Sequence, residues 1–185
     1  MEQKYHYFIK RWSEGYFNVS KEGHVIVTPT RQKNSGDLYK LIQTLVEQGI
    51  EPPILIRFNE ILRDRIQTIH AAFLSAIDEF QYRSVHLMAF PIKVNPQQSV
   101  VEAVQRYGRE LTMGLEVGSK PELIAVLTLE INPKALLLCN GYKDAEYISL
   151  ALTACKLGKR TVIIIEQTYE LKLVLEIAQK LDVEA

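Results

Sequence analysis

Lys93 is the residue of this sequence whose type and position best suit covalent chemistry. It lies near the end of the apolar run at residues 85–94, and a helix start follows at once. A lysine amine is a nucleophile only when it is partly desolvated, and a rigid strand end lets a protein control that desolvation. Such an amine could form a Schiff base with a carbonyl compound. A solvated surface charge is the simpler alternative, because lysine is almost never fully buried.

Glu116 is the acidic residue that could act together with Lys93. It lies at the end of the next apolar run, residues 111–117. An amine and a carboxylate on neighbouring strands can share protons and shift the pKa of one another. A structural ion pair, or two unrelated solvated charges, would have the same spacing. Both interpretations stay open at this point.

Other polar residues follow the ends of the apolar runs and carry weaker signals. Ser119 begins the capping box at residues 119–122, so a helix cap explains it more simply than a nucleophile does. Asn140 follows the run at residues 135–139. The remaining polar residues at such positions are Arg57, Asn59, Asn95, Tyr142 and Glu166. The four histidines have neither metal-ligand nor triad spacing, so we interpret them as structural residues and predict no metal ligands. They are His6, His24, His70 and His86.

A repeating βα pattern positions these residues. From residue 53 onward, a short apolar run, turn residues and an amphipathic helix recur about every 25–30 residues, the size of one βα unit. Because the runs are continuous rather than alternating, we expect strands buried on both faces and hence a parallel sheet. Function gathers beyond the carboxyl ends of such strands. The predicted strands are residues 54–58, 85–94, 111–117, 135–139 and 161–165.

The predicted helices have recognisable ends. Ser, Asn and Asp are good N-caps, and proline is tolerated in the first turn. The predicted caps are Asn59, Asn95 (with Pro96 as the first helical residue), Ser119 and Asp144, and Thr168 opens a last helix that reaches residue 181.

The N-terminal part differs from this pattern. Two short β-prone runs, residues 16–19 and 24–28, enclose a turn with Gly23, which predicts a β-hairpin. A helix is expected at residues 37–48. We therefore expect an N-terminal β element at residues 1–36 and a second domain at residues 37–185.

Two architectures accept five successive βα units. One is an open doubly wound sheet, and the other is a (β/α)₈ barrel. Five units could complete the open sheet, but they make only part of a barrel, which has eight strands and about 250 residues. The pattern alone leaves this choice open.

The composition narrows the functional classes. The 185 residues carry no net formal charge and are 47% hydrophobic, so nothing indicates binding to nucleic acid or to a membrane surface. The sequence shows no signal-peptide pattern and no apolar run long enough for a membrane span. Cys139 and Cys155 fit no metal spacing, and we expect both to be buried apolar residues in a reducing compartment, the cytoplasm.

Three segments, taken together, resemble the family of biosynthetic arginine decarboxylases. They are residues 90–95 (FPIKVN), 114–123 (GLEVGSKPEL) and 139–147 (CNGYKDAEY), and residues 15–19 (GYFNV) are similar to an early segment of that family. These pyridoxal-phosphate enzymes belong to the alanine-racemase-like group, with the ornithine and diaminopimelate decarboxylases. The resemblance runs in order over essentially the whole chain, and the third segment favours the arginine branch.

The resemblance implies a pyridoxal-phosphate-binding (β/α)₈ barrel of the TIM type, here its first five βα units, and a β-rich domain to which the N-terminal hairpin belongs. It implies that Lys93 holds pyridoxal phosphate as a Schiff base and that Glu116 lies near the cofactor, with Ser119 and Asn140 as further cofactor contacts. The implied reaction converts L-arginine to agmatine and CO₂, in the biosynthesis of putrescine and spermidine. Magnesium is implied as a second cofactor without placed ligands, and a homo-oligomer is implied for the full-length enzyme.

The sequence also departs from the family. Phe90, Pro96 and Val117 stand where the family usually has Tyr, Gln and Ala. The family's ring-stacking histidine, phosphate-binding loop and ring-nitrogen acid would follow residue 185. We therefore expect a fragment of an arginine decarboxylase that is inactive alone. The alternatives are a non-catalytic interaction module that pairs with a complementary chain, a related pyridoxal-phosphate amino-acid decarboxylase, and a small carrier of pyridoxal phosphate.

Overall fold

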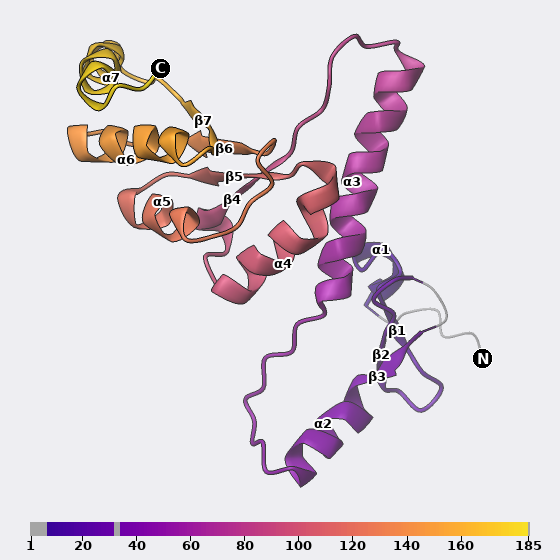
Figure 1. Cartoon of the computed structure of the whole chain (residues 1–185). Helices are drawn as coiled ribbons and strands as arrows, with labels where there is room; N and C mark the ends of the chain where they lie inside the picture. The colour runs from indigo at the N-terminus through magenta and orange to yellow at the C-terminus, as the bar shows by residue number, and fades with distance from the viewer. Residues whose placement is uncertain (1–6, 32–33, 185) are drawn as a thin grey trace. The chain divides into compact units, whose positions relative to one another are not determined.

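The computed structural model of the chain describes residues 7–31 and 34–184 (Figure 1). The chain forms two compact units, Met1–Arg65 and Ile66–Ala185. This division groups residues by their contacts and not by domain membership. The domain boundary expected after residue 36 therefore stays a prediction.

A small antiparallel sheet organises the first unit. Its strands have the order β1-β2-β3. The turn between β1 and β2 has Gly23 at φ +88°, a conformation that favours glycine, and the N–H groups of Glu22 and His24 donate to Ser20 Oγ at 3.2 Å. The predicted hairpin is thus present. The elements of this part are α1 (Ile9–Trp12), β1 (Phe17–Val19), β2 (Val25–Val27), β3 (Gly36–Asp37) and α2 (Leu38–Glu47).

One predicted strand is wrong. Residues 54–58 are not a strand in the structure, although they form a continuous apolar run. A strand needs a neighbour whose backbone N–H and C=O groups pair with its own. In the first unit the described strands β1, β2 and β3 pair with one another, and none of them pairs with this run. The apolar pattern therefore could not produce a strand by itself.

A parallel sheet organises the second unit (Figure 1). Its four strands follow one another in the order β4-β5-β6-β7. A doubly wound sheet reverses its strand order at a switch point, whereas a (β/α)₈ barrel adds each strand next to the previous one. The observed order favours the partial barrel. The strands are β4 (Ala89–Pro91), β5 (Gly114–Val117), β6 (Leu136–Cys139) and β7 (Arg160–Ile163).

Helices connect these strands, and most of their predicted ends are present. Asp144 Oδ1 accepts the N–H of Tyr147 at 2.9 Å, and Ser119 Oγ accepts the N–H of Glu122 at 3.5 Å. The cap predicted at Asn95 is wrong, because a 3₁₀ turn precedes it and the helix begins only at Gln98. The helices are α3 (Asn59–Glu79), which begins in the first unit, η1 (Ile92–Val94), α4 (Gln98–Gly108), η2 (Arg109–Leu111), α5 (Lys120–Leu127), α6 (Ala145–Lys156) and α7 (Thr168–Leu181).

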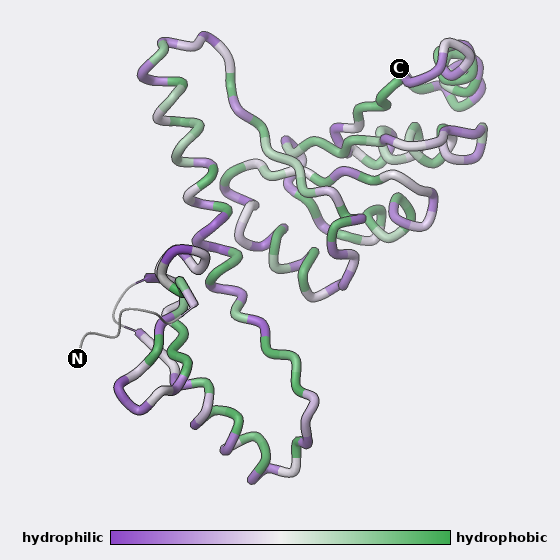
Figure 2. The backbone as a smooth tube through the Cα atoms, turned by 180° about the vertical axis from the view of Figure 1, so that it is seen from behind, coloured by the Kyte–Doolittle hydropathy of each residue, from purple (hydrophilic) through white to green (hydrophobic). Residues whose placement is uncertain are grey.

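The core of the second unit lies between the strands and the helices that connect them. Leu115, Val117, Leu137 and Cys139 of the central strands are fully buried against side chains of α5 and α6. A second cluster joins α6 to α7. Green and purple segments alternate along the helices in Figure 2, as expected for helices with one apolar side. Among the described residues, no helix has the length and apolar composition needed to cross a membrane.

Candidate functional site

Lys93 and Glu116 come together at the carboxyl ends of β4 and β5. Lys93 lies in η1, directly after β4, and Glu116 is the register partner of Pro91, the last residue of β4. The Nζ atom of Lys93 is 3.4 Å from Oε1 of Glu116. The parallel register therefore creates an amine–carboxylate pair, one of the alternatives that the sequence spacing left open.

The two members of this pair differ in their exposure. The side chain of Lys93 is 61% exposed, whereas that of Glu116 is 11% exposed. Among the described residues, Oε2 of Glu116 is buried and has no hydrogen-bond partner. A buried acceptor without a donor is unfavourable, and such atoms often mark a place for a ligand or a water molecule. The pair thus combines an accessible amine with a carboxylate that can accept one further hydrogen bond.

The local sequence explains why Lys93 is exposed. The side chain of Ile92 is 4% exposed and belongs to the core, whereas Val94 is 70% exposed. The turn is closed by the N–H of Asn95, which donates to the carbonyl of Ile92 at 3.0 Å. Ile92 therefore anchors the turn while Lys93 stays accessible.

Ser119 begins the helix that follows Glu116. Besides its own bond to the N–H of Glu122, the cap is closed by Glu122, whose Oε2 accepts the N–H of Gly118 at 2.7 Å. The preference for a cap over a nucleophile agrees with this geometry. Ser119 nevertheless lies at the same edge of the sheet as Lys93 and Glu116, because it follows β5 by two residues.

Asn140 lies at the carboxyl end of β6, next to the end of β5. Its N–H donates to the carbonyl of Val117 at 2.8 Å, and its Oδ1 accepts the N–H of Gly141 at 2.9 Å. Gly141 has φ +75°, and a Cβ at this position would overlap the carbonyl group of Gly118. Only glycine permits this approach, which brings the turn after β6 against the turn after β5.

Two residues of this region were not singled out as site residues in the sequence analysis. Lys143 and Glu170 are fully buried, and Nζ of Lys143 is 3.4 Å from Oε2 of Glu170. A lysine in a turn and a glutamate in the first turn of a helix normally face solvent. The only available signal was that Glu170 is the third residue of α7, where a carboxylate often caps backbone N–H groups.

Burial also governs the ionisation of neighbouring groups. Burial raises the pKa of the Cys139 thiol to about 12, so this cysteine is an inert apolar residue at neutral pH. Burial likewise raises the pKa of Tyr147, whose hydroxyl donates to the carbonyl of Val117 at 3.1 Å. Cys139 is buried as predicted, whereas the predicted burial of Cys155 is wrong, because this residue is only half-buried; both are free thiols.

The other predicted positions are distributed over both units and the residues outside the described part. Arg57 belongs to the first unit, and Asn59 begins α3 there. Tyr142 is 76% exposed. His6 lies outside the described residues, so its structural role stays a prediction. Within residues 7–31 and 34–184, no three His, Cys, Asp or Glu side chains lie close enough together to bind a metal ion as a cluster.

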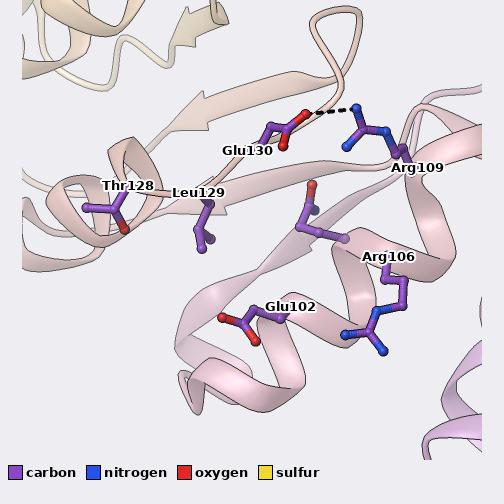
Figure 3. A pocket seen from close by; sticks show the side chains of 7 residues that line it. Glu102, Arg106, Arg109, Thr128, Leu129 and Glu130 are labelled. Carbon is purple, nitrogen blue, oxygen red and sulfur yellow. Dashed lines mark hydrogen bonds and ion pairs between the residues drawn. The ribbon is translucent and has the colours of Figure 1, made fainter.

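A cavity of 420 Å³ lies elsewhere on the second unit (Figure 3). Arg106 and Arg109 come from the end of α4 and from η2, and Glu130 comes from the segment that leads into β6; Arg109 Nη2 is 3.1 Å from Glu130 Oε1. These segments precede the amino ends of β5 and β6. The cavity therefore does not include the predicted site residues, which lie at the carboxyl ends.

Comparison with known proteins agrees with this arrangement. Residues 64–184 match the family described as "Pyridoxal-dependent decarboxylase, pyridoxal binding domain". The biosynthetic arginine decarboxylase of Gloeobacter violaceus is 46% identical over 178 residues, which are 96% of this chain and 28% of that protein. The corresponding protein of Prochlorococcus marinus (strain AS9601) is 43% identical over 176 residues, which are 95% of this chain and 27% of that protein.

A solved structure has the same fold. The crystal structure of the biosynthetic arginine decarboxylase SpeA from Campylobacter jejuni has a TM-score of 0.85 and 28% sequence identity. The match covers 93% of this chain and 29% of the other. This chain thus spans less than a third of the length of the relatives that it matches. The fold class predicted from the sequence, part of a pyridoxal-phosphate-binding barrel after a small β element, is confirmed.

Proposed function

The chain belongs to the family of pyridoxal-dependent decarboxylases, and from that premise we propose that it provides the cofactor-bearing lysine of a biosynthetic arginine decarboxylase. Its relatives carry that name at 46% and 43% identity, and the arginine branch was also favoured by residues 139–147. The proposed reaction converts L-arginine to agmatine and CO₂. The proposal concerns a whole enzyme of the relatives' length, of which this chain spans only a part.

The pair of Lys93 and Glu116 is the observation that carries this proposal. The exposed Nζ of Lys93 can reach the aldehyde carbon of pyridoxal phosphate, and Lys93 would hold the cofactor covalently. Oε2 of Glu116 is a buried acceptor without a described partner, so its lone pairs can accept a hydrogen bond from a further donor. The amine of Lys93 and the free acceptor of Glu116 are therefore compatible with the cofactor at this edge of the sheet.

The chain's own residues would orient the reacting groups. The bound cofactor supplies a sink for the electrons that remain when the substrate carboxylate leaves as CO₂. Glu116 Oε1 lies 3.4 Å from Nζ of Lys93, a distance at which the carboxylate can orient the amine and accept a proton from it. Ser119 and Asn140 are proposed as further contacts, because both follow strands that end at this edge.

Several family properties stay predictions for the whole enzyme. Magnesium as a second cofactor, a homo-oligomeric state and a role in polyamine biosynthesis come from the resemblance, and the cytoplasmic location comes from the interpretation of the two cysteines. None of them is needed for the assignment of Lys93.

A trapping experiment tests the proposal. The purified chain is mixed with pyridoxal phosphate and reduced with borohydride, and the modified lysines are mapped by peptide mass spectrometry. We expect the label on Lys93. The matched control is Lys172, an 82% exposed lysine on α7 whose carboxylate partner, Glu176, is 3.8 Å away. Equal labelling of Lys93 and Lys172 would contradict the proposal.

A second candidate function follows from the edge of the parallel sheet. Among the described strands, β7 pairs only with β6, so one row of its backbone groups is available to another strand. This supports an interaction module that pairs with a complementary chain. The trapping experiment distinguishes the two functions, because an interaction module requires no specific label on Lys93.

A further inference from the structure

Two opposite charges are completely buried in the second unit. The side chains of Lys143 and Glu170 are 0% and 1% exposed, and Nζ of Lys143 is 3.4 Å from Oε2 of Glu170. Lys143 lies in the connection after β6, and Glu170 lies in the first turn of α7, which follows β7. Burying a charge is costly unless it is paired and hydrogen-bonded, and an apolar pair of similar volume often gives equal or greater stability. Stability alone therefore does not explain why charges occupy these positions.

The hydrogen bonds of the pair show what the charges hold in place. Nζ of Lys143 donates to the carbonyl of Gly141 at 2.6 Å. Oε2 of Glu170 accepts the N–H groups of Glu166 at 2.8 Å and of Gln167 at 3.2 Å. The pair thus fastens the turn after β6 to the turn that leads into α7. Two methionines of similar size could fill the same space, but they could not form these bonds.

The turn held by Lys143 continues to the candidate site. The backbone of Gly141 lies so close to that of Gly118 that a methyl group on Gly141 would overlap the carbonyl group of Gly118. The N–H of Asn140 donates to the carbonyl of Val117, the residue after Glu116. A continuous series of contacts therefore runs from Glu170 through Lys143 and Gly141 to the end of β5.

We propose that Lys143 and Glu170 are positioning residues, whose buried ion pair fixes the turn at Asn140 and Gly141 against the end of β5 and thereby orders the edge that carries Glu116. That the ordered edge is a cofactor site rests on the proposed function. The fixing of the turn itself does not, so the two claims can be tested separately.

The experiment compares single and paired substitutions in the whole chain. K143M leaves the buried carboxylate of Glu170 without its cation, whereas K143M/E170M replaces the pair by two apolar side chains. K172M is the matched control, because Lys172 belongs to an exposed ion pair on the same helix as Glu170. Three quantities are measured for each variant: the midpoint of urea unfolding, hydrogen exchange of the backbone amides in residues 139–147, and borohydride-trapped pyridoxal phosphate on Lys93.

If the pair positions the turn, the double variant should recover its stability against urea without recovering the slow amide exchange of residues 139–147. We expect K143M to unfold at a lower urea concentration, and K143M/E170M to recover most of that loss. In both variants the amides of residues 139–147 should exchange about tenfold faster than in the wild type, because the hydrogen bond from Lys143 to the carbonyl of Gly141 is gone. Trapping on Lys93 should fall in both variants, and K172M should match the wild type in all three measurements.

Other results would overturn the proposal. If K143M/E170M regains the exchange rates of the wild type together with its stability, the pair only fills the core. If the wild-type chain traps no cofactor on Lys93, the proposed function fails at this site, and the exchange rates still decide whether the pair fixes the turn. If K143M does not fold, amide exchange and cofactor trapping in K143M/E170M are compared with those of the wild type to test the proposal.

Discussion

Nζ of Lys93 and Oε1 of Glu116 lie 3.4 Å apart, although the amine is largely exposed and the carboxylate is buried. The contact joins the ends of two parallel strands, because Glu116 is in register with Pro91 and Lys93 follows in the adjoining turn. The asymmetry makes the two side chains experimentally separable. Changes at Lys93 should affect chemistry, whereas changes at Glu116 should affect both chemistry and folding.

Replacing Lys93 should abolish cofactor capture and leave the fold intact. In K93M, we expect no specific label after treatment with pyridoxal phosphate and borohydride. Because the side chain is 61% exposed, the free energy of unfolding should change by no more than about 0.5 kcal/mol. Peptide mass spectrometry and urea unfolding measure the two effects. A folded K93M that is labelled at the same edge as the wild type would place the reactive amine elsewhere.

Removing the charge of Glu116 should weaken capture more than stability. In E116Q the buried group stays polar but loses its charge, and the pair that it loses has a mostly exposed amine. The free energy of unfolding should therefore stay within about 1 kcal/mol of the wild type. Capture on Lys93 should fall clearly below that of E176Q, a control at an exposed ion pair. Equal capture in E116Q and E176Q would argue against a role for Glu116.

Gly141 should tolerate no side chain. In G141A the methyl group meets the carbonyl oxygen of Gly118 and the backbone is held at φ +75°. We expect a loss of about 2–4 kcal/mol in the free energy of unfolding. Gly158 is the matched control, because it has φ +77° and no atom within 4 Å of a Cβ. G158A should lose only about 1 kcal/mol; equal losses would mean that the contact with Gly118 is unimportant.

Glu170 should make the fold sensitive to acid. Burial opposes its ionisation, but the N–H groups of Glu166 and Gln167 and the cation of Lys143 outweigh burial, so the pKa of Glu170 is lowered. A lowered folded-state pKa stabilises the fold above the unfolded value of about 4.3, and this stabilisation is lost as the pH falls through the folded value. The midpoint of urea unfolding should therefore fall more steeply below that pH for the wild type than for E170Q. Parallel pH profiles would contradict the assignment.

The chain alone should not decarboxylate arginine. The chain spans 28% of the length of its Gloeobacter violaceus relative, and we expect the remainder of such an enzyme to supply groups that hold the cofactor tightly. We expect no agmatine when the 185-residue chain is incubated with pyridoxal phosphate and L-arginine. Agmatine formation that K93M lacks would show that the chain carries a complete active site.

Local signals in the sequence were sufficient for most helix ends, and they also named the candidate site residues, whose roles stay predictions. The caps at Ser119 and Asp144 depend on hydrogen bonds within a few residues, so a short motif contains the whole interaction. The cap at Asn95 failed because the helix begins only at Gln98, after a 3₁₀ turn at residues 92–94 that the apolar pattern does not reveal. Lys93 was identifiable because its charge ends an apolar run.

The tertiary structure decided what depends on distant residues. Residues 54–58 have the composition of a strand, but none of the described strands pairs with them. The order β4-β5-β6-β7 separates a barrel from an open sheet only once the strands are paired. Register brings Lys93 to Glu116, and packing buries Lys143 with Glu170. Pairing and burial depend on which segments become neighbours in space, so a linear pattern can name the charged residues and cannot determine their partners.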